Sequence, residues 1–202
     1  GLFRLRFGAS VNNNDTFDIQ TDENLVHFSG DIPTFNNNGT VRKSAGTGVT
    51  LFESHPYNLG TIEVLTGTLS VGVTSAVASS EGSFLVADGS LLVLRGNQTM
   101  LPTSTISGAG SLAYTGGGTL ILNTDSPIDV SSMLLSGGTM QVTEPITLTG
   151  DFSFQDGFLT GVGSLNVLGS MIWTDGEQDG TGETIVSGGL TLDGANTKIL
   201  NS

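Results

Sequence analysis

The chain has 202 residues, with 30 glycines and no cysteine, and its 19 acidic residues against 6 basic ones give a net charge of −13. This balance argues against a nucleic-acid partner and against an anionic membrane surface, because phosphate binding depends on Lys and Arg. The apolar runs are too short for membrane insertion, and a chain without cysteine has no disulfide framework. We therefore expect a β-rich chain that meets proteins, glycans or cations.

The first fifteen residues fit the rest of the pattern least well. They hold Arg4, Arg6 and the run Asn12, Asn13 and Asn14. We expect residues 1–15 to form an irregular first coil or a junction to a preceding domain. The whole chain, residues 1–202, is expected to be a single domain, since an array of similar units grows along one axis as one cooperative body.

From residue 39 onward, a glycine followed by Thr or Ser and then by alternating apolar residues recurs along the chain. Copies include Gly39-Thr-Val-Arg, Gly60-Thr-Ile-Glu-Val, Gly67-Thr-Leu-Ser-Val, Gly118-Thr-Leu-Ile-Leu and Gly163-Ser-Leu-Asn-Val. The alternation has the period of a strand with one apolar face. We expect one interior to be lined by Leu69, Val71, Leu92, Leu94, Leu120, Leu122, Met140, Val142, Leu165 and Val167.

Longer copies support a stack of such strands. Segments that begin at Thr16, Ser83 and Thr184 align the same inward positions, which are Phe17, Phe84 and Thr184, then Ile19, Val86 and Val186. Repeats spaced by roughly 20–28 residues are typical of solenoids, in which stacking buries faces that no single unit could bury. The pattern predicts an all-β fold, a parallel β-helix (β-solenoid). The alternative, a β-sandwich, would show longer strands without such copying.

Residues 37–48, 59–71 and 171–184 resemble the repeats of very large bacterial surface proteins, including autotransporter passengers and filamentous-haemagglutinin-like adhesins. The resemblance covers most of residues 36–200. It implies a right-handed parallel β-helix in a non-catalytic structural or adhesive segment of an exported, extracellular cell-surface protein. The implied partners are neighbouring domains of the same protein, other copies end to end, glycans or cell-surface proteins.

Parallel β-helices also include enzymes, so a carbohydrate-binding or carbohydrate-cleaving protein is the alternative. Asn123-Thr124-Asp125 resembles one element of the polygalacturonase signature, but the companion motifs are missing. A hydrolase needs two carboxyl groups across one cleft. His27 and His55 also lack a motif-level partner. We therefore expect a turn at residues 123–125 and no catalytic residue.

The strongest candidate for a cofactor site is the acidic segment with Asp175, Glu177 and Asp179, followed by Gly180. Oxygen ligands at alternate positions before a glycine resemble the opening of a calcium loop. The twelfth position of such a loop would be Val186 instead of Glu. The segment is therefore either a calcium site or an exposed acidic turn.

Trp173, the only tryptophan, precedes the acidic segment. An exposed indole ring could stack on a sugar and bind a ligand, whereas a buried one would pack in the core. Either parity of Met171-Ile172-Trp173 gives an apolar inward face, so both readings of Trp173 remain open.

Overall fold

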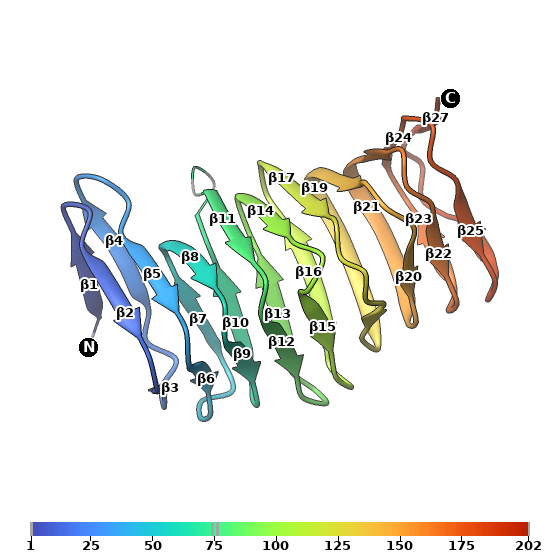
Figure 1. Cartoon of the computed structure of the whole chain (residues 1–202). Helices are drawn as coiled ribbons and strands as arrows, with labels where there is room; N and C mark the ends of the chain where they lie inside the picture. Colours follow the sequence, from blue (N-terminus) through green and yellow to red (C-terminus); the bar gives the residue numbers. More distant parts are fainter. Residues whose placement is uncertain (1, 74, 76, 202) are drawn as a thin grey trace.

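The computed structural model describes residues 2–73, 75 and 77–201. These residues form a parallel β-solenoid of about nine turns with ~21 residues per turn, and they contain no helix. The turns follow one another along a single axis, so the two ends of the chain lie at opposite ends of the molecule (Figure 1). The predicted all-β solenoid is confirmed, and the spacing of its turns falls within the predicted range.

Equivalent strands of successive turns stack in three columns, which we call a, b and c. Column a contains β1 (Phe3–Arg6), β4 (Leu25–Ser29), β7 (Val49–Phe52), β10 (Thr68–Val71), β13 (Leu91–Leu94), β16 (Ser111–Thr115), β23 (Met171–Trp173) and β26 (Leu190–Leu192). Column b contains β2 (Ser10–Asn13), β5 (Thr34–Asn37), β8 (His55–Asn58), β11 (Val77–Ser80), β14 (Asn97–Met100), β17 (Thr119–Leu122), β24 (Gly176–Gln178) and β27 (Lys198–Leu200). The long strands β19 (Ser132–Val142) and β21 (Asp151–Gly161) run through both columns and join them into one sheet.

Column c is a separate sheet of nine parallel strands. It contains β3 (Thr16–Ile19), β6 (Thr40–Lys43), β9 (Thr61–Val64), β12 (Ser83–Val86), β15 (Thr105–Ser107), β18 (Ile128–Asp129), β20 (Ile146–Leu148), β22 (Leu165–Val167) and β25 (Thr184–Val186). The aligned copies that begin at Thr16, Ser83 and Thr184 all fall in this column. Phe17 and Phe84 lie in one row of the register, as predicted. The prediction is wrong for the third copy, because that row continues through Ile128, Leu148 and Val167 to Val186, two residues beyond Thr184.

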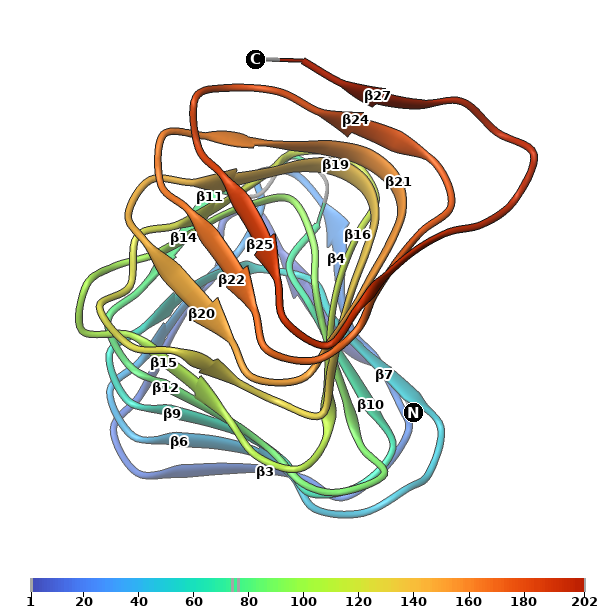
Figure 2. The same cartoon turned by 90° about the vertical axis from the view of Figure 1, so that its right-hand side faces the viewer.

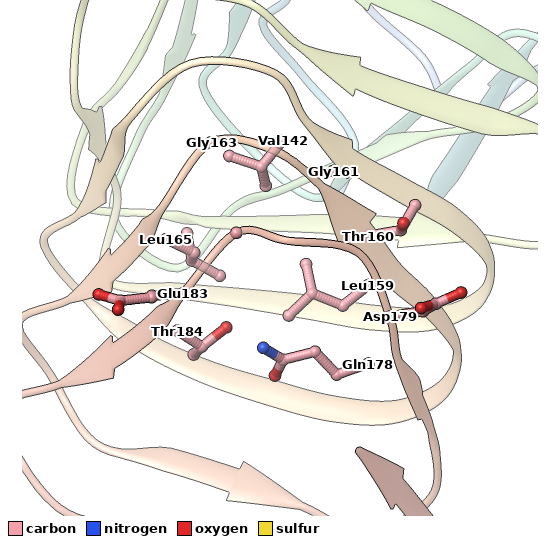
Figure 3. Close-up of a pocket in the computed structure, with 11 residues that line it drawn as sticks. Val142, Leu159, Thr160, Gly161, Gly163, Leu165, Gln178, Asp179, Glu183 and Thr184 are labelled. Atoms are coloured by element: carbon pink, nitrogen blue, oxygen red, sulfur yellow. The ribbon is translucent and has the colours of Figure 1, made fainter. Parts of the chain in front are cut away.

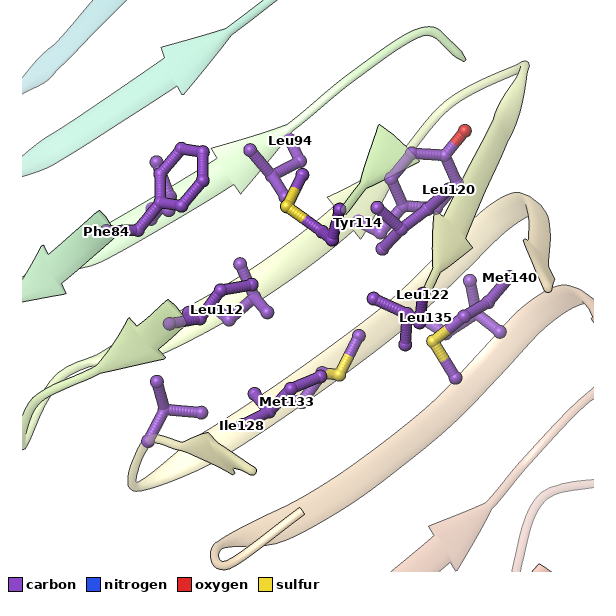
Figure 4. Packing of buried hydrophobic residues seen from close by; sticks show 14 of the residues in the cluster. Phe84, Leu94, Leu112, Tyr114, Leu120, Leu122, Ile128, Met133, Leu135 and Met140 are labelled. Atoms are coloured by element: carbon purple, nitrogen blue, oxygen red, sulfur yellow. The ribbon is translucent and has the colours of Figure 1, made fainter. Parts of the chain in front are cut away.

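The interior is a continuous stack of apolar side chains (Figure 4). All ten residues predicted to line it are 2% exposed or less. Neighbouring turns place like residues over one another, as where Leu69 pairs with Leu92 and Val71 with Leu94. Stacking therefore gives each short strand the buried face that it could not obtain alone.

The recurring glycines mark corners where one turn lies directly on the next. A Cβ atom at Gly60 would be 2.0 Å from the carbonyl oxygen of Gly39, and one at Gly82 would be 2.1 Å from that of Gly60. The Thr61 amide donates to the same Gly39 oxygen at 2.8 Å. The repeat needs glycine here because the close backbone contact leaves no room for a side chain.

The first turn is more regular than its sequence suggests. Strand β1 already pairs with β4, and β2 pairs with β5 in continuous register. The irregularity is a register shift between Leu5 and Arg6 and a left-handed backbone at Phe7, where φ is 52°. Within residues 2–15, the departure from the repeat is therefore limited to one corner.

The last turn is the most open part of the structure. Every residue of β26 is exposed, and its Leu192 is 63% exposed. Figure 2 looks onto this end and shows β25 and β27 with no turn in front of them. In the part of the chain described by the structure, no helix is long and apolar enough to span a membrane.

We predict that Val71→Asp lowers the free energy of unfolding by about 4 kcal/mol, because it places an unpaired carboxylate in the interior. The matched control is Val93→Asp in β13, where the side chain is only partly buried on the outward side of the alternation. Urea denaturation measures both variants. Equal losses of stability in the two variants would contradict the assignment of Val71 as inward and Val93 as outward.

A second prediction concerns the close contact of the turns. Gly60→Ala should cost about 3 kcal/mol, since its Cβ atom meets backbone that must shift. At Gly89, where φ is +70° and no atom lies within 4 Å of an added Cβ, the same substitution should cost only the backbone term. That term is ~1 kcal/mol. A Gly60 variant no less stable than the Gly89 variant in thermal melting would contradict this account of the repeat.

Candidate functional site

The acidic segment lies on β24 and the corners beside it, and each of its three carboxylates has a local hydrogen-bond partner. Asp175 accepts hydrogen bonds from the Gly176 amide at 2.7 Å and from Asn196 Nδ2 at 2.8 Å. Asp179 accepts from the Gly180 amide at 2.7 Å, and Glu177 accepts from Asn201. Among the described residues, no group of three or more His, Cys, Asp or Glu side chains is placed to hold a metal ion. The geometry thus gives the calcium interpretation no support, and it stays a prediction.

Trp173 lies in the core. It is 6% exposed, and its ring stacks on Phe154 with 5.3 Å between centroids. Its Nε1 donates to the carbonyl oxygen of Asp175 at 2.8 Å. Sugar stacking needs an open ring face, and here a neighbouring aromatic ring covers one. Trp173 therefore packs on Phe154 near the C-terminal end, and a ligand-binding role for it stays a prediction.

The remaining candidate residues hold turns together. Thr124 is buried and donates to the carbonyl oxygen of Ser104, and the Asp125 amide donates to Pro102. His27 Nε2 lies 2.8 Å from the carbonyl oxygen of Gly30, and His55 Nδ1 accepts from the Val77 amide at 2.8 Å. Each group bonds to backbone within its own corner or in a neighbouring turn, which is the arrangement of a structural contact.

A buried lysine is the polar site that sequence reasoning missed. Lys43 ends β6 at an inward position and is fully buried. Its Nζ donates to Asp22 Oδ1 at 2.8 Å, to the carbonyl oxygens of Thr21 and Ala45 at 3.2 and 3.1 Å, and to Thr50 Oγ1 at 3.2 Å. A buried ammonium group is tolerated when its protons are all satisfied in this way. The group ties the corner after β3 to the corner after β6.

The Lys43 ammonium group also sets the ionisation of its partner. Its hydrogen bond holds the pKa of the Asp22 carboxyl below the ordinary value, helped by the Gly48 amide and by the attraction of the lysine charge. Partial desolvation opposes this shift. The ion pair therefore favours the charged carboxylate in the folded state.

A second missed feature is a ladder of buried amides in column b. Asn13 Nδ2 donates to Asn37 Oδ1 at 2.7 Å, Asn37 Nδ2 donates to Asn58 Oδ1 at 2.8 Å, and Asn58 Nδ2 donates to Ser80 Oγ at 3.1 Å. Identical amides stacked at the strand spacing satisfy one another, so their burial leaves no polar group unpaired. The recurrence of Asn two residues before Gly39 and Gly60, with Asn13 two residues before Asp15, was the available signal.

Two cavities lie near the acidic segment. The small void of Figure 3 has a volume of about 10 Å³, which is no more than the room for one water molecule. Leu159 and Gln178 lie in its middle, whereas Asp179 and Glu183 lie on opposite sides of it (Figure 3). A larger hollow of about 610 Å³ opens at the C-terminal end and is lined mostly by apolar side chains, including those of Met171, Trp173 and Leu200.

Comparison of the chain with protein-family models, with curated proteins and with solved structures finds no match. The fold is therefore established by the stacked strands themselves. The resemblance to autotransporter passengers and filamentous-haemagglutinin-like adhesins remains a resemblance of repeats, and the structure agrees with it at the level of a β-solenoid.

We predict that Asp22→Asn is less stable than the parent at neutral pH and that this difference shrinks in acid. A depressed pKa in the folded state contributes stability above the unfolded value of about 3.9 and loses it as the pH falls through the folded value. Urea denaturation from about pH 7 to about pH 2 measures the difference. Asp88→Asn, at an exposed residue, is the control. A difference that is constant over this range would contradict the role given to the ion pair.

Proposed function

We propose that the chain is a non-catalytic structural and adhesive segment of a large exported cell-surface protein. Its stacked turns would act as a stiff spacer that holds neighbouring domains away from the cell and offers repeated shallow surfaces for weak, multivalent contacts. The observation that carries the proposal is that the candidate polar groups form hydrogen bonds inside the stack. They bond to backbone atoms of their own corners or of neighbouring turns, as seen for Asp175, Thr124, His27 and His55.

Composition supports the same interpretation. The net charge of −13 keeps a Gly-rich rod soluble, and stacking without cysteine suits an extracellular repeat protein stabilised along its whole length. The six basic residues include only one adjacent pair, Arg42 and Lys43, and Lys43 is buried. An acidic polysaccharide would find little positive charge to bind.

The test is antibody labelling of intact cells that produce the protein, with permeabilised cells as the control. The proposal expects equal labelling of both, because the segment would project from the surface. Labelling that needs permeabilisation would contradict a surface location.

Assays of purified chain on neutral and acidic polysaccharides test the alternative of a carbohydrate-cleaving enzyme. Reducing ends and unsaturated products should stay at background, because Asp125 lies in a structural turn. Turnover that disappears in Asp125→Asn would overturn the non-catalytic assignment.

A further inference from the structure

The outward face of column a carries a nearly uncharged strip of side chains between β7 and β23. Two rows of outward residues cross these strands, and the register joins each residue to its counterpart in the next turn. We call these rows the outer strip. One row is Val49, Thr68, Leu91, Ser111, Ser132 and Asp151, and the other is Leu51, Ser70, Val93, Ala113, Leu134, Ser153 and Ile172. Asp151 is the only charged residue in them, although the chain has 19 acidic residues.

Large and small side chains alternate along the second row of the outer strip. The large ones are Leu51, Val93, Leu134 and Ile172, and the small ones between them are Ser70, Ala113 and Ser153. One period spans two turns, or about 9.6 Å. Ser70 and Ala113 are only 5% and 1% exposed, although they face outward. The middle of the strip is therefore a continuous, mostly apolar surface, and such a surface on an acidic chain indicates a protein contact.

The outer strip is hollowed at Ser153. Leu134 and Ile172 lie one turn away from Ser153 on either side. A hollow of about 200 Å³ lies among these three residues, and Asp151 also lines it. The hollow has room for an apolar side chain, with a carboxylate beside it.

The same strip carries the side chains that fit this hollow. Arg95 follows Val93 at the next outward position and is partly buried. Within the described residues, its guanidinium group makes no hydrogen bond or ion pair. Asp151 is exposed, and its Oδ1 accepts hydrogen bonds from the amide and the hydroxyl of Ser170, both at 2.8 Å. A valine beside a cation thus matches a small residue beside a carboxylate.

The order of these residues fixes how two strips would meet. Arg95 lies two residues after Val93, whereas Asp151 lies two residues before Ser153. A two-fold axis perpendicular to the strip reverses both the strand direction and the order of the turns. Such an axis brings both pairs into contact at once, which a simple translation of one strip over the other would not do.

We propose that two copies of the chain pack their outer strips face to face about a two-fold axis that passes between Ala113 and Leu134. The axis places Val93 of each copy over Ser153 of the other and Arg95 over Asp151. The contact uses the same surface on both copies, so it closes as a dimer. The inference rests on the fold alone and holds whether or not the chain acts at a cell surface.

The size of the outer strip limits the strength of the dimer. Six strand spacings of about 4.8 Å make it about 29 Å long, and four residues of strand make it about 13 Å wide. Two such faces bury roughly 750 Å² of flat area, well below the roughly 1,600 Å² of a standard interface, so we expect a weak dimer. Asp88 and Asp156 are exposed on the corners beside the strip and meet at the rim of the dimer, where water and salt screen them.

Sedimentation velocity at rising concentration, up to about 1 mM, tests the dimer. The parent should change from monomer to dimer and grow no further. Val93→Asp should stay monomeric, because its carboxylate would enter the hollow beside Asp151. The matched control is Leu85→Asp, at a 40% exposed outward position of column c, which should dimerise like the parent. Melting curves verify that each variant folds.

A parent that stays monomeric over this range, or one that grows beyond a dimer, would overturn the proposal. Equal dimerisation of Val93→Asp and Leu85→Asp would overturn it as well.

A charge exchange tests the position of the two-fold axis. Arg95→Asp and Asp151→Arg should each weaken dimerisation about tenfold, since each places like charges opposite one another. Asp151→Arg also reduces the net negative charge, so a general charge effect would strengthen association instead. Asp129→Arg, at an exposed residue of column c, measures that general effect. The double variant should recover most of the loss, and losses that add would overturn the pairing of Arg95 with Asp151.

Discussion

The structure depends on the parallel hydrogen bonding of each turn to the turn before it. Strands paired in this way lie about 4.8 Å apart, so every residue meets its counterpart one turn away. At the corners that spacing excludes a Cβ atom, and glycine recurs there, as at Gly39, Gly60 and Gly82. On the inner face it places apolar residues over apolar residues and amides over amides.

One row of column b, that is, the residues at one position of successive turns, contains both polar and apolar buried side chains. The row begins with Asn13, Asn37, Asn58 and Ser80, which bond to one another, and it continues as Met100, Leu122 and Val142, which are buried apolar side chains. A polar residue is tolerated inside the stack when its neighbour in the next turn supplies its hydrogen bond. The residue type at each interior position therefore depends on its neighbours in the same row, and a substitution in one turn mainly affects the turns on either side.

The sequence was sufficient to predict the strands that follow the recurring glycines, their phase and the stacking, because a period of two after a glycine leaves few alternatives. It did not predict column b strands such as β8 and β14. The sequence was insufficient to predict which polar side chains are buried and what they bind. Lys43 follows the same alternation as Val41, but nothing in the sequence near it indicates that Asp22 and two carbonyl oxygens surround its ammonium group. Trp173 was ambiguous because Met171, Ile172 and Trp173 are all apolar, and only the register, with Trp173 over Phe154, decides which face it takes.

This account describes the protein as a one-dimensional stack whose stability comes from contacts between adjacent turns and whose ends are its weakest points. Native-state hydrogen exchange of the monomeric chain, resolved by residue, tests that claim most directly. The account predicts that amides of the central strands β16, β17 and β19 exchange most slowly and that protection falls steadily toward β1–β3 and toward β25–β27. Uniform protection along the chain, or the highest protection in a terminal turn, would contradict it.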